Sequence, residues 1–173
     1  METKVTTHIT KGLVISLLLI VLNLVGHVLN IDLESWFGWI AVGIFIIAIA
    51  WSVNIYGKQM NYNVTFGNLF AHGFKTTAVG ICITFRYTLL SVYLIFPDSI
   101  DRIVQKGMEK AIQDKKMTED QVQQSLPMIK KITTITIIAG SILGNAIVGA
   151  VGALIGAAIT KKQPQDPFGN QAI

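Results

Sequence analysis

The sequence predicts an all-α integral membrane protein with four transmembrane helices and an amphipathic helical hairpin between the third and the fourth. Two observations predict this fold class. Of the 173 residues, 51% are hydrophobic and only 14% are charged, which is about half the charge density of an ordinary soluble domain. The apolar residues also gather into long blocks separated by polar segments, as in membrane spans. We therefore expect residues 1–160 to form a single transmembrane domain.

Each of the four apolar blocks can cross a hydrocarbon layer of about 30 Å at about 1.5 Å per helical residue. The first is expected to be a retained helix, because no Ala-x-Ala site for removal of a secretory signal follows it. The second is framed by tryptophans and a tyrosine, as interfacial aromatic belts predict. The fourth is longer than one crossing needs and must tilt, bend or protrude. The predicted spans are residues 12–29, 36–55, 78–96 and 132–159.

Two connections are predicted to contain helices outside the membrane. Thr65 is a candidate N-cap for an interfacial helix that starts near Phe66 and leads into the third span. Residues 98–130 should form the helical hairpin, whose second helix is bent by Pro127. The apolar stripe of this hairpin must cover the bilayer interface, its partner helix or another protein. The polar tail, residues 161–173, is predicted to be disordered.

The distribution of charge predicts a bacterial inner-membrane protein with both termini in the cytoplasm. The loop between the first two spans holds Asp32 and Glu34 and no base. The connection from 97 to 131 would lie outside, and its seven Lys/Arg against six Asp/Glu form a weak contrary signal. The short segments expected inside carry the remaining lysines, Lys4, Lys11, Lys58, Lys75, Lys161 and Lys162.

Several function classes are disfavoured. The net charge of +4 does not indicate a nucleic-acid partner, because the basic residues are scattered at block edges and form no stripe with aromatic residues. Cys82 is the only cysteine, so no intrachain disulfide or cysteine-rich metal site is expected. No Ser-His-acid triad can be assembled, so we expect neither an enzyme nor a bound cofactor. His27 and His72 are expected to be exposed to interfacial water.

Arg86 lies near the centre of the third predicted span, about 12 Å along the helix from Ala78 and about 15 Å from Phe96. A charge at this depth costs at least about 2.5 kcal/mol, so a compensating partner is expected. Because the spans contain no Asp or Glu, we predict an intramembrane polar cluster of Arg86, Asn23 and Asn145. This cluster would bind an anion, a lipid phosphate or a partner carboxylate. The alternative is that Arg86 reaches toward interfacial water.

The last span is rich in glycine and alanine at four-residue spacing. Small residues at this spacing let helix backbones approach closely, which predicts a packing seam. The seam would pack either within the bundle or against a second copy of the chain. Its predicted glycines are Gly140, Gly144, Gly149, Gly152 and Gly156.

Five segments in order resemble one known family. They are "TFGNLFAHGF", "YLIFPDSID", "MTEDQVQQSLP", the Gly/Ala-rich last span, and "KK" followed by proline. Their order is similar to that of domain of unknown function 4199, a family of small membrane proteins mostly from the Bacteroidota. The resemblance covers nearly the whole chain and implies four spans and no assigned activity. Because family members are often encoded beside a membrane-associated glycosyltransferase, it also implies such an enzyme as a partner. Arg86 matches no family motif.

Two functions remain as hypotheses. The first is an inner-membrane interaction or accessory protein that supports envelope or lipid-linked glycan assembly and binds through the last span's seam and the 98–130 hairpin. The second is a small transporter or channel subunit with an anion path lined by Arg86, Asn23 and Asn145. Transporters typically show internal repeats, and no convincing repeat is found here, so only a homo-oligomer would enclose a pore.

Overall fold

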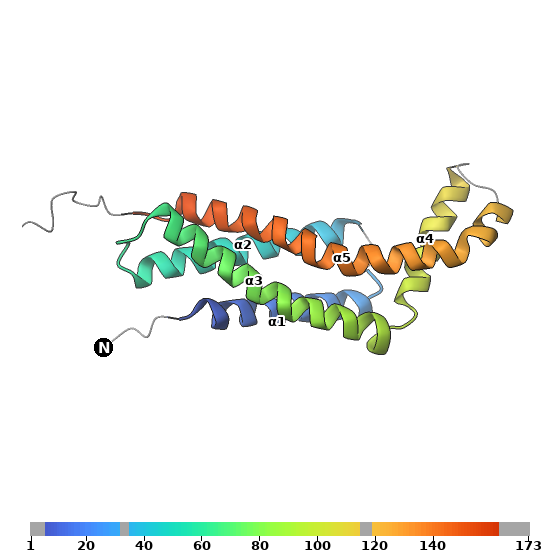
Figure 1. Cartoon of the computed structure of the whole chain (residues 1–173), viewed down its shortest axis with the longest axis horizontal. Helices are drawn as coiled ribbons and strands as arrows, with labels where there is room; N and C mark the ends of the chain where they lie inside the picture. Colours follow the sequence, from blue (N-terminus) through green and yellow to red (C-terminus); the bar gives the residue numbers. More distant parts are fainter. Residues whose placement is uncertain (1–5, 32–34, 115–118, 163–173) are drawn as a thin grey trace, which may run out of the picture. The chain divides into compact units, whose positions relative to one another are not determined.

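A computed structural model describes residues 6–31, 35–114 and 119–162 of the chain, and over these ranges all regular structure is helical (Figure 1). A π-helical turn, Ser91–Ile95, directly follows the third α-helix. Four helices are long and apolar enough to cross a membrane, which confirms the predicted number of spans and indicates a multi-pass membrane protein. The α-helices are α1 (His8–Val28), α2 (Ser35–Gln59), α3 (Phe66–Leu90), α4 (Ser99–Gln113) and α5 (Glu119–Ile159).

The interfacial helix predicted from Phe66 and the third predicted span belong to one helix. α3 runs unbroken from Phe66 to Leu90. Thr65 caps it as expected, because its side-chain oxygen accepts a hydrogen bond from the backbone N–H of Asn68 at 3.2 Å. Gly73 lies inside this helix and packs against α5, where a Cβ atom would lie 2.7 Å from that of Ala153.

The fourth apolar block is the C-terminal part of a 41-residue helix, α5, which starts at Glu119. The second helix of the predicted hairpin is therefore not a separate element. Pro127 lies inside α5 and does not end it. Proline is tolerated within a helix at the loss of one backbone hydrogen bond. The predictions for Asp32, Glu34 and the tail beyond residue 162 lie outside the described residues.

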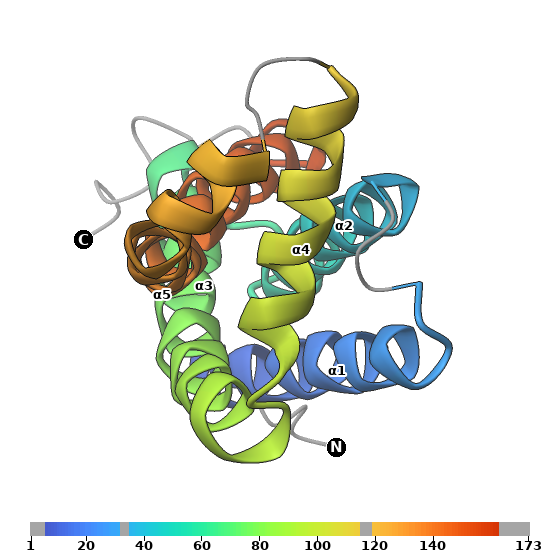
Figure 2. The ribbon, with the colours of Figure 1, turned by 90° about the vertical axis from the view of Figure 1, so that its right-hand side faces the viewer.

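The chain forms two compact units. Unit 1 comprises residues 1–80 and 146–173, and unit 2 comprises residues 81–145. In unit 2, α4 crosses the N-terminal part of α5 steeply (Figures 1 and 2), and Lys130 of α5 pairs with Asp101 of α4 at 2.6 Å. Ile100 and Val104 of α4 are buried, whereas its charged residues Lys106 and Glu109 are exposed.

Unit 1 is a bundle of α1, α2, the first half of α3 and the last part of α5 (Figure 1). Its core is fully buried around Ile49, Val53 and Leu69. In contrast, large apolar residues point outward on every helix, for example Leu17 at 57% exposure and Trp39 at 75%. An apolar exterior of this kind matches a hydrocarbon surrounding rather than water.

Glycines of α5 determine how closely α2 and α3 approach it. A Cβ atom on Gly156 would lie 2.8 Å from the Cα atom of Ala50, and one on Gly152 would lie 3.1 Å from the carbonyl oxygen of Ile46. A Cβ atom on Gly149 would overlap the side chain of Thr77. These three helices therefore meet at places where no side chain larger than hydrogen fits without a shift.

The seam glycines of unit 2 differ from those of unit 1. Cβ atoms added to Gly140 and Gly144 would meet no atom of the described residues within 4 Å. The choice between bundle packing and homodimerisation therefore stays a prediction for this half of the seam.

We expect Gly156→Ala to destabilise the protein by about 1–3 kcal/mol, because the added methyl group meets the backbone of Ala50. Gly43→Ala on α2 is the matched control, since its Cβ atom would meet nothing within 4 Å and alanine favours a helix by up to about 1 kcal/mol over glycine. Unfolding in mixed detergent micelles measures both. Equal stability of the two variants would contradict the close contact.

Candidate functional site

Lys11 lies inside unit 1, although the ammonium group of a lysine is strongly hydrated in water. It is only 8% exposed and sits on the face of α1 that carries the small residues Gly12 and Ser16, both also buried. This face packs so closely on α3 that a Cβ atom on Gly12 would lie 2.8 Å from the carbonyl oxygen of Thr76. The helix packing therefore carries the lysine stem into the bundle.

The ammonium group of Lys11 meets three neutral acceptors on two other helices. It donates to the backbone carbonyl of Ser52 at 3.2 Å and to the side-chain oxygen of Gln59 at 3.4 Å, both on α2. The third contact is with Nε2 of His72 on α3, at 3.3 Å. Because an ammonium only donates, Nε2 accepts and the His72 proton lies on Nδ1. All three distances are at or beyond the long end of the usual range.

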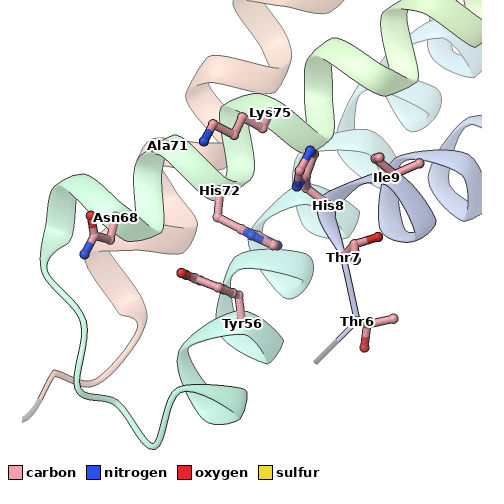
Figure 3. Close-up of a pocket in the computed structure, with 9 residues that line it drawn as sticks. All are labelled: Thr6, Thr7, His8, Ile9, Tyr56, Asn68, Ala71, His72 and Lys75. Carbon is pink, nitrogen blue, oxygen red and sulfur yellow. The ribbon is translucent and has the colours of Figure 1, made fainter. Parts of the chain in front are cut away.

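Aromatic rings hold His72 in place. Its ring stacks on Tyr56 with centroids 4.0 Å apart and an angle of 5° between the planes. On the other side, His8 approaches edge-on with its centroid at 6.2 Å (Figure 3). The Tyr56 ring also lies 5.8 Å from the Lys11 nitrogen, within cation–π range. We call Lys11, Tyr56, Gln59 and His72 the Lys11 cluster.

No carboxylate balances this charge. Residues 6–31, 35–80 and 146–162, which are the described part of unit 1, contain no Asp or Glu. The neutral dipoles around Lys11 solvate its charge but do not neutralise it. Burial of an ion without an opposite charge is unfavourable, so among the described residues the charge of Lys11 is stabilised by neutral dipoles alone.

Two cavities flank the cluster. The polar cavity, of about 390 Å³, is lined by Thr7, His8, Asn68, His72 and Lys75 among others (Figure 3). The apolar cavity, of about 250 Å³, has Lys11 and Ser52 on its wall together with Val14, Ile15, Trp51 and Ile55. Thr6 lines both cavities, so they lie side by side at this end of unit 1. The described residues include no group of three or more His, Cys, Asp or Glu side chains suited to a metal ion.

The residues of the predicted intramembrane cluster lie in different units. Arg86 is exposed on α3 and belongs to unit 2, whereas Asn23 is exposed on α1 in unit 1. Asn145, also in unit 2, donates its side-chain amide to the carbonyl of Ser141 at 2.7 Å. The joint cluster of Arg86, Asn23 and Asn145 remains a prediction.

The Lys11 cluster was not predicted from the sequence. Lys11 was expected to flank the first span and His72 to be exposed to interfacial water, yet both are only 8% exposed. The buried residues of α3 recur at helical spacing, from Leu69 through His72 to Gly80. A stripe of small and polar residues with this period was the available signal.

The family is shown by a match over most of the chain. The sequence model of the family described as "Protein of unknown function (DUF4199)" matches residues 10–162. The chain belongs to the DUF4199 family. The matched range contains every residue of the Lys11 cluster. No curated protein and no solved structure matches this DUF4199 protein.

The burial of Lys11 predicts unequal reactivity of lysines in the DUF4199 protein. In detergent at about pH 10.5, where even an ordinary lysine is about half deprotonated, an amine-reactive reagent should label Lys11 about tenfold or more slowly than Lys58, because Lys11 must first leave its acceptors. Lys58 is exposed in the last turn of α2. Peptide mass spectrometry over a time course measures both rates. Equal rates would contradict the buried position.

Proposed function

We propose that this DUF4199 protein is a non-enzymatic accessory protein of the bacterial inner membrane that binds an anionic, phosphate-bearing component of envelope or lipid-linked glycan assembly. The observation that carries the proposal is the Lys11 cluster, a buried cation held by neutral groups from two other helices. Such a group gains a charge-assisted hydrogen bond when an anion arrives.

The surroundings of the cluster support an anionic ligand. His8 and Lys75 line the polar cavity beside it, and the described part of unit 1 offers no competing carboxylate. An electropositive cavity with low-dielectric walls raises the local concentration of anions.

The orientation follows from the other lysines at this end of the bundle. Lys58 lies in the last turn of α2, and Lys162 follows α5 with its nitrogen 5.3 Å from the centroid of the Phe66 ring. Because positive residues favour the cytoplasmic side, the proposal places this end and both termini in the cytoplasm. A membrane-bound glycosyltransferase, as implied by the family resemblance, would then meet the ligand from the side where activated sugars are made.

A phosphate-bearing ligand should stabilise the protein through Lys11. In neutral detergent, added phosphatidylglycerol or inorganic pyrophosphate should raise the melting temperature, whereas phosphatidylcholine should not, because ligands that bind only the folded state stabilise it. Lys11→Met should abolish the rise while keeping the side chain's apolar bulk. Lys58→Met, an exposed cation at the same end, should retain it. An undiminished rise in Lys11→Met would refute the proposal.

Anion transport is the second candidate function. It is favoured by the exposure of Arg86 on a helix that is long and apolar enough to cross a membrane, since a lone exposed guanidinium is costly in lipid. A homo-oligomer that buries Arg86 around a shared path would remove this cost.

Transport would appear as anion flux in liposomes that contain the protein. Arg86→Leu should abolish the flux and Arg86→Lys should retain part of it, because the path requires a positive charge. Flux of the same size in the Arg86→Leu protein, or none in the unchanged protein, would rule out this second candidate.

A further inference from the structure

The hydroxyl of Ser52 is the exception among the buried hydroxyl groups of unit 1. Ser16, Thr76, Thr77 and Thr160 are buried, and each donates to a backbone carbonyl of its own helix. Ser52 is 1% exposed, and its Oγ atom has no hydrogen-bond partner among the described residues. Buried hydroxyl groups are nearly always paired. An unpaired one leaves a hydrogen bond to be made by a partner other than the described residues, such as water or a ligand.

This hydroxyl lies where the apolar cavity meets the Lys11 cluster. Ser52 lines the cavity, as does Lys11, and the ammonium of Lys11 donates to the carbonyl of the same serine. Two residues with donor groups therefore border this cavity, and the rest of its lining is Thr6, Thr10, Val14, Ile15, Trp51 and Ile55. Most of the lining is hydrocarbon, with the lysine and the serine at its edge.

We propose that the apolar cavity binds an anionic membrane lipid whose headgroup oxygens accept hydrogen bonds from Lys11 and Ser52. This inference rests on the proposed anion binding by the Lys11 cluster and identifies the ligand class. A free phosphate shares the headgroup chemistry, but it would leave the apolar walls empty. The lipid is favoured because its first carbons cover those walls.

The dimensions fit part of a lipid. The cavity of about 250 Å³ is smaller than the roughly 300–1,000 Å³ of sites that enclose a drug-sized ligand. It holds the atoms next to the headgroup, and the rest of the chain continues over Val14 and Trp51, which are 57% and 64% exposed. These side chains lie on the apolar exterior of unit 1, which the bilayer would cover.

The neighbouring polar cavity takes the outer part of the headgroup. It adjoins the apolar cavity at Thr6 and carries His8, Asn68 and Lys75. Cations and hydrogen-bond donors on this wall favour an acidic or hydroxylated headgroup. A choline headgroup is disfavoured, because its positive charge would face Lys75.

Fluorescence quenching by a brominated lipid tests the position of the chain. In the full-length protein with Trp36→Phe and Trp39→Phe, the sole tryptophan is Trp51. In neutral detergent, phosphatidylglycerol with brominated acyl chains should quench Trp51 saturably. Excess unbrominated phosphatidylglycerol should reverse the quenching. Inorganic phosphate should need a much higher concentration to compete, and brominated phosphatidylcholine should quench only weakly.

Two variants separate the parts of the site. Ser52→Ala should lower the affinity for the lipid three- to tenfold. It should leave the melting temperature of the lipid-free protein unchanged or higher, since the hydroxyl makes no hydrogen bond with the described residues. Val14→Phe, whose larger side chain fills the cavity from its exposed wall, should lower the affinity for the lipid at least tenfold. Val21→Phe is the matched control, because Val21 is 49% exposed on α1 and does not line the cavity.

Each contrary result has a distinct meaning. Unchanged lipid affinity in both Ser52→Ala and Val14→Phe overturns the lipid site. Competition by inorganic phosphate as strong as that by the lipid also overturns it, while anion binding by the Lys11 cluster stands. Lipid binding that survives Lys11→Met overturns the inference and the proposed function together.

Discussion

The close approach of α5 to α2 and α3 is the constraint on which the arrangement of unit 1 depends. Van der Waals contact drives helix association in lipid, because burial of apolar side chains gains little when the solvent is itself apolar. Gly149, Gly152 and Gly156 remove the side chains that would separate the axes. The paired hydroxyls of Thr76 and Thr77 make the α3 side of this contact compatible with burial.

The same tight packing explains why a lysine is buried at one end of the bundle. With α1 held against α3 at Gly12, Lys11 is directed between α2 and α3 and finds acceptors there. This burial is unfavourable, because the described groups that contact the charge of Lys11 are neutral. The proposed anion binding uses this arrangement, since dipoles at 3.2–3.4 Å can be exchanged for an oxyanion at shorter distance.

Hydropathy predicted the number of apolar helices, because blocks of this length are hard to place in any other structure. It placed the start of the third span only at Ala78, since His72, Lys75, Thr76 and Thr77 lower the local hydropathy although three of the four are buried. The start of α3 followed instead from Thr65 as its cap. The contact of His72 is a tertiary property, because its partner Lys11 lies 61 positions away. Likewise, nothing in the local pattern shows that the helix starting at Glu119 continues without a boundary past residue 132.

The Lys11 cluster also determines the order in which contacts can form while the chain is synthesised. The three acceptors of Lys11 lie 41, 48 and 61 positions later in the chain. While the ribosome is still translating α2, the ammonium therefore has only water and lipid headgroups to solvate it. The contacts of Lys11 cannot all form before His72 has left the ribosome. The complete packing of α1 therefore follows the emergence of the first turns of α3.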